Sequence, residues 1–205
     1  DYYYEKYMLT KKEISLIPKS FDIVGDILIF SEFPKELNKK EKEVGLYFLD
    51  KLKNIKVVTK KIKHYSGKYR TPKLKIIAGE NRKETIHKEN GALIKLNPEK
   101  VYFSPRLGSE RLRVSKLIKR NESVLVMFSG VAPYPLTISK NSKAEEICAI
   151  ESNKEAHKYA EQNIKLNKLN NIKIFKGDVK KVLPIIKKKF DRIIMPLPKD
   201  SEKYL

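Results

Sequence analysis

The second half of the chain alternates short apolar runs with longer amphipathic stretches. The apolar runs predict buried strands, and the stretches between them predict helices. The expected order is a strand at 123–128, a loop and a helix, a strand at 144–150, a helix at 154–166, a strand at 173–175, a helix at 179–188 and a strand at 192–195. Because strands that alternate with helices form parallel sheets, the pattern predicts a doubly wound α/β domain.

The first half has shorter and more varied patterns. Residues 21–30 are β-branched and apolar around Gly25-Asp26, which predicts two short strands joined by a tight turn. Apolar residues at a spacing of four predict an amphipathic helix within residues 35–52. Residues 1–19 are aromatic and charged without a clean period, and a start on Asp is typical of a trimmed or processed end. We assign no function to them.

Further strands and a hairpin complete this half. Apolar residues predict strands at 57–58 and 74–78, separated by a basic loop at 64–73 that contains glycine and proline. Asn90-Gly91 lies between alternating residues and predicts a β-hairpin over 85–96.

A length of 205 residues allows one large domain or two small ones, and two fit these patterns better. We place the boundary just before the hairpin, near residue 85. Residues 1–85 then form a small α+β domain, and residues 86–205 form a nucleotide-binding type of α/β domain.

Basic residues outnumber acidic ones by 45 to 25, which gives a net charge of +20 and a pI near 9.8. An excess of this size favours RNA or DNA as a partner. A lysine-rich composition also accounts for part of it, so the prediction depends on the clusters at 60–75 and 111–120. In the first cluster, Lys68, Tyr69 and Arg70 could bind phosphate or stack on a base, or form a solvated loop.

The sequence offers no disulfide framework and no metal-ligand spacing. Cys148 lies in an apolar run, as expected for a small core residue in a reducing compartment. His64, His87 and His157 are scattered, so we predict no metal site. No apolar run reaches the roughly 18 residues of a membrane span, and no signal-peptide pattern is present. We therefore expect a cytoplasmic protein.

Three residues at predicted strand ends suggest a cofactor site, because ligands of doubly wound sheets bind outside the carboxyl ends of the strands. Gly130 would let the backbone approach a cofactor, Glu151 would hold ribose hydroxyls, and Asp178 would lie near the base. Each acid has an alternative role as a cap or first-turn acid of the following helix. Together, the three favour a cofactor pocket.

A cation and a carboxylate precede the first strand of this sheet. Arg106 and Glu110 are four residues apart, so they share one face if residues 108–119 are helical or begin to be. Such a pair beside a cofactor loop suggests acid–base chemistry. The alternative is an ordinary surface ion pair.

Six segments resemble one known family. They are VYFSPRLGSER at 101–111, which is the most specific, AGENRKETIHKENG at 78–91, MFSGVAP at 127–133, AIESN at 149–153, NIKLNKL at 163–169 and IIMPLP at 193–198. Together they resemble the archaeal and eukaryotic tRNA guanine-37 N1-methyltransferases. The resemblance implies a Rossmann-like class I methyltransferase domain preceded by a small RNA-facing domain. It also implies methyl transfer to N1 of the guanosine 3′ to the tRNA anticodon.

Carried over position by position, the resemblance implies four catalytic residues. Arg70 matches a guanine-facing arginine, and Tyr102 matches a base-stacking aromatic residue. Arg106 matches an arginine near guanine O6, and Glu110 matches the general base. Guanine N1 carries a proton at neutral pH, so a carboxylate must accept it while a cation stabilises charge on O6. The base must first leave its stack, which costs less in an anticodon loop than in a duplex.

The resemblance also implies a cofactor, S-adenosylmethionine. The residues expected to bind it lie in the loop and at the strand ends: Phe128, Gly130, Val131, Pro133, Glu151, Asp178 and Pro196. The expected partner is the anticodon stem-loop of tRNA, bound by a monomer.

Three positions depart from the family pattern. Val126 replaces an acidic residue at the start of the loop, Ala132 replaces its second glycine, and Pro196 replaces the asparagine of an Asn-Leu-Pro motif. Each departure can weaken cofactor binding or catalysis. Further strands after the fourth, and the N-terminal domain of many archaeal members, are expected to be missing from this chain.

Two alternatives therefore stay open. The related aminocarboxypropyl transferase of wyosine synthesis uses the same cofactor, although Glu110 within SPRLGSER favours methyl transfer. A non-catalytic RNA-binding protein would keep the fold and would explain all three departures. The sequence does not reveal the oligomeric state or the tRNA species.

Overall fold

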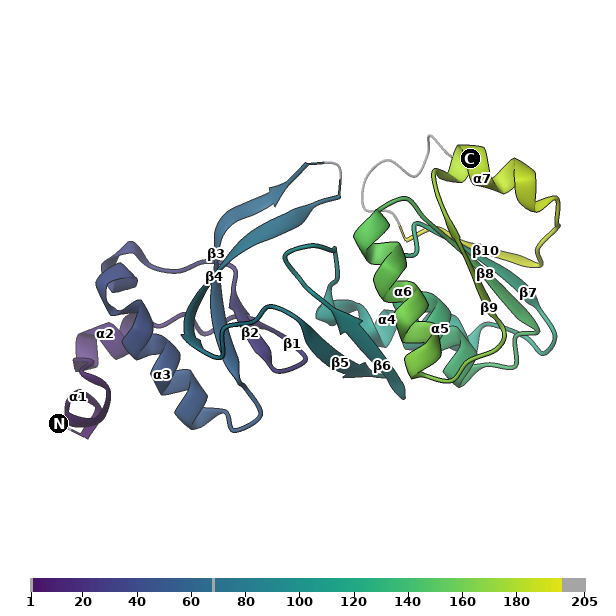
Figure 1. Ribbon diagram of the computed structural model, residues 1–205. Helices are drawn as coiled ribbons and strands as arrows, with labels where there is room; N and C mark the ends of the chain where they lie inside the picture. Colours follow the sequence, from purple (N-terminus) through teal and green to yellow (C-terminus); the bar gives the residue numbers. More distant parts are fainter. Residues whose placement is uncertain (1, 68, 197–205) are drawn as a thin grey trace. The chain divides into compact units, whose positions relative to one another are not determined.

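The computed structural model describes residues 2–67 and 69–196 (Figure 1). The chain divides into two compact units. Unit 1 comprises Asp1–Ile86 with Asn97–Glu99, and unit 2 comprises His87–Leu96 with Lys100–Leu205. Each unit has a sheet and an apolar core of its own.

Unit 1 combines short helices with one mixed sheet. Its elements are α1 (Tyr2–Tyr7), α2 (Lys11–Leu16), β1 (Asp22–Val24), β2 (Ile27–Phe30), the 3₁₀ helix η1 (Lys35–Lys40), α3 (Glu41–Lys51), β3 (Val57–Ser66) and β4 (Thr71–Gly79). In the described part of the unit, the strands form a four-stranded sheet in the order β1-β2-β3-β4. The pairs β1–β2 and β3–β4 are antiparallel, and β2–β3 is parallel.

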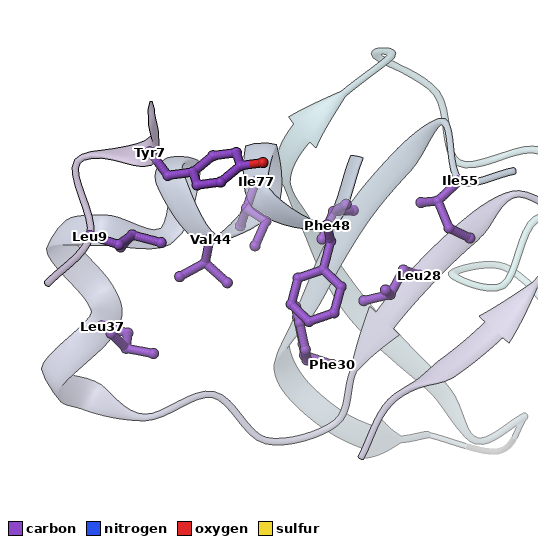
Figure 2. Close-up of a cluster of buried hydrophobic side chains, with 10 residues drawn as sticks. Tyr7, Leu9, Leu28, Phe30, Leu37, Val44, Phe48, Ile55 and Ile77 are labelled. Atoms are coloured by element: carbon purple, nitrogen blue, oxygen red, sulfur yellow. The ribbon is translucent and has the colours of Figure 1, made fainter. Parts of the chain in front are cut away.

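An apolar cluster packs this sheet against α3 (Figure 2). Phe30 of β2 and Phe48 of α3 are buried in edge-to-face contact, with ring centroids 5.2 Å apart. Tyr7 and Leu9 belong to the same cluster, so the N-terminal residues are part of the core. The absence of a side chain at Gly45 lets α3 approach β4, because a Cβ there would lie 2.5 Å from the Cβ of Ala78.

The expected elements of unit 1 are present, but several boundaries differ. The two strands around Gly25 are confirmed, whereas the helix expected within 35–52 begins as a 3₁₀ helix. The expected loop at 64–73 is wrong at both ends, because β3 continues to Ser66 and β4 begins at Thr71. Exposed lysines alternate with buried residues in β4, and this period of two is that of a half-buried strand. Lys68 lies outside the described residues.

The N-terminal helices were not predicted. The aromatic and charged residues at 1–19 give no periodic pattern, yet α1 and α2 form there. A capping box starts α2, in which the Thr10 hydroxyl accepts from the Glu13 backbone and the Glu13 carboxylate accepts from the Thr10 backbone.

The remaining elements begin with a hairpin and continue as alternating strands and helices. They are β5 (Thr85–Glu89), β6 (Ala92–Leu96), the 3₁₀ helix η2 (Pro105–Leu107), α4 (Gly108–Lys116), β7 (Ser123–Met127), α5 (Pro133–Asn141), β8 (Glu146–Glu151), α6 (Lys154–Leu166), β9 (Ile172–Lys176), α7 (Val179–Ile186) and β10 (Arg192–Ile194). In the described residues, the order of the parallel strands is β10-β7-β8-β9. This is the doubly wound sheet that the alternating pattern predicts.

Both faces of this sheet are covered. Leu125 and Met127 of β7, with Cys148 and Ile150 of β8, form a cluster with α7 on one face. Their strand neighbours are also buried, and α5 and α6 contact β8 as well. Cys148 is 2% exposed, and burial raises the pKa of its thiol. The predicted buried position of this cysteine is therefore confirmed.

The predicted elements of this unit agree with the structure more closely than those of unit 1. The helix expected at 154–166 has those bounds, and the hairpin turns at Asn90-Gly91. The helix expected at 108–119 ends earlier, at Lys116.

Candidate active site

Residues 128–133, called the cofactor loop below, connect β7 to α5 through three left-handed backbone positions. Phe128, Gly130 and Ala132 have φ values of 53°, 58° and 72°. Ala132 is the N-cap of α5, and Pro133 takes the first helical position, where a missing N–H costs no hydrogen bond. The turn brings the backbone of the loop to the carboxyl end of β7, as the sequence predicts.

Glu151 holds this loop from the neighbouring strand. It ends β8 and is 9% exposed. One carboxylate oxygen accepts from the Gly130 N–H at 2.6 Å, and the other accepts from the Asn153 N–H at 2.7 Å. Asn153, and not Glu151, caps α6, because its side chain accepts from the Glu155 backbone at 3.0 Å. A carboxylate has about four acceptor positions, so Glu151 keeps capacity for a ligand hydroxyl.

The next strand ends beside Glu151. The Gly177 N–H donates to the Glu151 carbonyl at 2.9 Å, and Asp178 follows directly. Asp178 caps α7 by accepting from the Lys180 N–H at 2.9 Å. The capping role that we considered as an alternative for Asp178 is therefore present, and a role in binding the base stays a prediction.

Two of the departures lie near the carboxyl ends of the neighbouring strands β7 and β10. Val126 is fully buried in β7, so it offers no charge to a cofactor. Pro196 follows β10 and is described, whereas Leu197 and Pro198 of the same motif lie outside the described residues. Val131 is fully buried in the loop, and its carbonyl accepts from the Asn163 side chain at 3.1 Å.

The segment that precedes α4 begins against the cofactor loop. A Cβ added to Gly130 would lie 3.8 Å from the Tyr102 carbonyl oxygen, so the Tyr102 backbone passes close to the loop. Tyr102 is 41% exposed, and its expected role in stacking on a base stays a prediction. Arg106 follows in η2 and is exposed, and Glu110 lies in the first turn of α4.

Glu110 pairs with an arginine that the sequence did not indicate. Arg113 donates to both of its carboxylate oxygens, at 2.7 and 2.6 Å. Arg106 lies in η2, which runs directly into α4, so the helix that the prediction requires is present, and a shared face for Arg106 and Glu110 stays a prediction. The hydrogen bonds from Arg113 lower the pKa of Glu110 below its ordinary value of 4.5. Glu110 is therefore ionised at neutral pH.

A buried ion pair anchors the same helix to the hairpin. Arg111 donates to both carboxylate oxygens of Glu89 in β5, at 2.6 and 2.7 Å, and to the Ser104 carbonyl at 2.9 Å. The two charged side chains are 3% and 7% exposed. Burial raises the pKa of Glu89, but hydrogen bonds from His87 and Arg111 outweigh it, and the net change is a lowering. Sequence reasoning missed this pair, because its members lie on separate elements.

Tyr134 is a second residue that sequence reasoning missed. It is the second residue of α5 and is half-buried. Burial raises the pKa of its hydroxyl, and the charges of Arg111, Glu110 and Arg113 also act on it. The only sequence signal was its position directly after Pro133 of the cofactor loop.

Arg70 belongs to unit 1, whereas the other three predicted catalytic residues belong to unit 2. It is exposed in the turn between β3 and β4, has a left-handed φ of 50°, and its N–H donates to the Gly67 carbonyl at 3.3 Å. Arg70 is therefore exposed to solvent at the end of the β3–β4 hairpin.

Residues 2–67 and 69–196 contain neither a cluster of metal ligands nor a membrane-spanning helix. No group of three or more His, Cys, Asp or Glu side chains there could hold a metal ion. None of the helices described is long and apolar enough to cross a membrane.

Comparison with known families decides the class of the α/β domain. Residues 85–205 match the model of the TRM5/TYW2 methyltransferase domain. The chain belongs to the TRM5/TYW2 methyltransferase family. Residues 6–82 match the TYW2 N-terminal domain, so the family likeness extends over both units. The family resemblance and the Rossmann-like fold inferred from the sequence are thereby confirmed.

Curated relatives of this chain include guanine-37 methyltransferases, 4-demethylwyosine-37 methyltransferases and an aminocarboxypropyltransferase. The tRNA (guanine(37)-N(1))-methyltransferase Trm5b of Pyrococcus abyssi is 48% identical over 189 residues, which are 92% of this chain and 55% of the relative. The tRNA(Phe) (4-demethylwyosine(37)-C(7)) aminocarboxypropyltransferase of Methanocaldococcus jannaschii is 37% identical over 182 residues, 89% of this chain and 69% of the relative. The chain thus spans about half the length of the Pyrococcus relative.

A solved structure of the family carries a nucleoside ligand. TYW2 of Pyrococcus horikoshii, in complex with MeSAdo, has a TM-score of 0.79 and 26% sequence identity. The match covers 99% of this chain and 72% of that one.

Proposed function

We propose that this protein transfers a methyl group from S-adenosylmethionine to N1 of the guanosine 3′ to the anticodon of a tRNA. The position of Tyr102 against Gly130 carries the proposal. The Tyr102 backbone passes close to the cofactor loop of a methyltransferase-family domain, and this supports a role beside the loop for the segment that continues to Arg106 and Glu110. A cation and an ionised carboxylate at that place suit the removal of a proton from a ring nitrogen.

The residues at the sheet edge fit the proposed cofactor. The left-handed turn at Gly130 exposes backbone rather than side chain to a ligand, and Glu151 retains acceptor positions for ribose hydroxyls. We propose Phe128, Gly130, Val131, Pro133, Glu151, Asp178 and Pro196 as its binding residues. S-adenosylmethionine, when bound, supplies an electrophilic methyl group.

The remaining catalytic work belongs to side chains of this chain. Glu110 accepts the N1 proton, and Arg106 stabilises the negative charge that moves onto guanine O6. Tyr102 stacks on the base once it has left the anticodon loop. We propose that Arg70, exposed in the β3–β4 turn, is a guanine-facing residue, which gives unit 1 a role in binding tRNA.

Glu110 must exchange partners during this reaction. The Arg113 hydrogen bonds keep the carboxylate ionised but also occupy both of its oxygens. We infer that Arg113 turns away when the guanine enters, because a carboxylate that keeps both bonds is a weak base.

The second candidate is aminocarboxypropyl transfer to the modified base at the same position. The Methanocaldococcus relative with that activity is 37% identical, against 48% for the guanine methyltransferase of Pyrococcus. This difference favours methyl transfer.

We infer that the protein works as a monomer in the cytoplasm, which suits a buried thiol at Cys148 and a tRNA substrate.

Single-turnover methylation of a full-length tRNA transcript tests the assignment. The variant Glu110→Gln keeps the size of the side chain but cannot accept the proton, so transfer should fall by roughly 10²- to 10⁴-fold while tRNA and cofactor still bind. Glu145→Gln, an exposed acid outside the loop, is the control and should react like the wild type. Near wild-type transfer by Glu110→Gln would eliminate the general-base role. Calorimetry that detects no binding of S-adenosylmethionine by the full-length protein would eliminate both enzyme candidates.

A further inference from the structure

We propose that Asn163 of α6 is a positioning residue that fixes the cofactor loop through the carbonyl of Val131. The inference rests on the proposed function of that loop in binding S-adenosylmethionine. It assigns a role to the NIKLNKL segment, whose two asparagines have none in the proposed chemistry.

The Asn163 side chain is fully buried and uses all of its usual hydrogen-bonding groups. Its Oδ1 accepts from the Lys95 N–H at 2.7 Å, and its Nδ2 donates to the Lys95 carbonyl at 3.0 Å. The second hydrogen of Nδ2 serves the Val131 carbonyl at 3.1 Å. One amide therefore ties a strand of the hairpin to the cofactor loop.

Asn167 repeats the strand contact one helical turn later. Its Oδ1 accepts from the Leu93 N–H at 2.8 Å, and its Nδ2 donates to the Leu93 carbonyl at 2.7 Å. Four helical residues rise about 6 Å. Two strand residues advance about 6.6 Å. The spacing of the two asparagines along α6 is therefore nearly equal to the spacing of Leu93 and Lys95 along β6. Each side-chain amide pairs with the N–H and carbonyl of one strand residue, as the backbone of a neighbouring strand would.

The two amides differ in their remaining hydrogen bond. The second Nδ2 hydrogen of Asn167 goes to the backbone carbonyl of Asn163, at 2.7 Å, and stays within α6. That of Asn163 leaves the helix and reaches Val131. Both asparagines thus contact β6, and of the two, Asn163 also contacts the cofactor loop.

The bond at Val131 acts on the strained part of the loop. The peptide group between Val131 and Ala132 sets the φ angle of Ala132, which is held at 72°. Left-handed backbone is unfavourable for alanine, so an unrestrained peptide group would rotate away. Glu151 holds the Gly130 N–H from β8, and Asn163 holds the Val131 carbonyl from α6. Together they fix both sides of the turn before a ligand binds.

The experiment compares Asn163→Ala with Asn167→Ala in the full-length protein. Both variants lose two hydrogen bonds to β6, so both should lower the unfolding midpoint. Only Asn163→Ala should weaken S-adenosylmethionine binding in calorimetry, by about fivefold, the factor that one ordinary hydrogen bond is worth. Hydrogen exchange adds a readout without cofactor: the Gly130 and Ala132 amides should exchange about tenfold faster in Asn163→Ala alone.

The outcomes separate this inference from the proposed function. Equal loop exchange and equal cofactor affinity in the two variants would overturn the positioning role. If Asn163 only stabilised the fold, as Asn167 does, the two substitutions would have the same effect on the loop and on cofactor binding. If the wild type binds no S-adenosylmethionine, the proposed function fails, and loop exchange still decides whether Asn163 fixes the loop. If Asn163→Ala does not fold, Asn163→Ser, which retains a donor and leaves a smaller defect, takes its place in both measurements.

Discussion

Ala132 is one of three left-handed residues that shape the cofactor loop. Ala132 has φ 72° and ψ 36°, a conformation that glycine adopts at no steric cost. The family pattern has glycine here, so this chain keeps the conformation with a residue that disfavours it. The departure therefore costs stability without changing the path of the backbone.

Replacing this alanine should stabilise the protein. We expect Ala132→Gly to raise the free energy of unfolding by about 1 kcal/mol, because relief of the left-handed strain exceeds the added entropy of the unfolded chain. Urea denaturation measures the change. Ala156→Gly, in regular helix in α6, should do the opposite by about 1 kcal/mol. A loss of stability in both variants would contradict the strain argument.

The Glu110–Arg113 pair makes the proposed activity depend on pH. Activity needs the ionised carboxylate, and the Arg113 hydrogen bonds lower its pKa, which places the acid limb of the rate profile at low pH. In Arg113→Ala the pKa rises, so the acid limb of kcat/KM against pH should move to higher pH. Lys116→Ala, which removes a cation from the end of the same helix, is the control. An unmoved limb in Arg113→Ala would show that another group titrates.

At the scale of an element, α4 is held by a charge pair that is almost completely buried. Glu89→Gln leaves the Arg111 charge without its partner, so we expect a loss of about 3–5 kcal/mol in the free energy of unfolding. Glu145→Gln, at an exposed acid, should change it little. Urea unfolding at neutral pH tests both. A loss no larger than that of the control would mean that the pair does not anchor α4.

The Glu89–Arg111 pair should make the protein less stable as the pH falls. The folded-state pKa of Glu89 lies below its ordinary value of 4.5, so its contribution is complete above that pH and is lost as the pH falls towards the folded-state pKa. The stability difference between the wild type and Glu89→Gln should therefore shrink in acid. Unfolding curves at successive pH values between neutral and acid measure it.

Sequence patterns predicted the elements of the α/β domain because each strand and helix has a clear local period. The helix at 154–166 and the Asn90-Gly91 turn need only neighbouring residues to be recognised. The helices before residue 19 were missed, because their apolar residues are too few to show a period, and tertiary contacts of α1 with α3 and of α2 with η1 hold them in place. The helix expected from residue 35 begins as the 3₁₀ helix η1.

The candidate site was predicted less completely than the fold. The strand-end positions of Gly130, Glu151 and Asp178 follow from the order of elements. The partner of Glu110 does not, because several arginines lie within reach of one carboxylate and the backbone decides between them. The long-range amide of Asn163, which joins α6 to a hairpin and to a loop, has no local signature at all.

For the molecule as a whole, a net charge of +20 should dominate the binding of RNA. Each phosphate contact contributes about −0.7 to −0.9 to the slope of log affinity against log salt, because bound counterions are released. We expect a steep fall in tRNA affinity between low and physiological salt in a filter-binding assay. Calorimetry of S-adenosylmethionine over the same range is the control and should give a nearly flat plot. A flat plot for tRNA would remove the electrostatic explanation.

The Cys148 thiol can serve as a probe of how fast the centre of the parallel sheet opens. It is the chain's single thiol, it is buried in β8 between β7 and β9, and burial raises its pKa. A thiol reagent can reach it only when these strands separate, so the labelling rate reports how often the sheet opens. The progress of one covalent modification would follow the opening of this core in the unaltered protein.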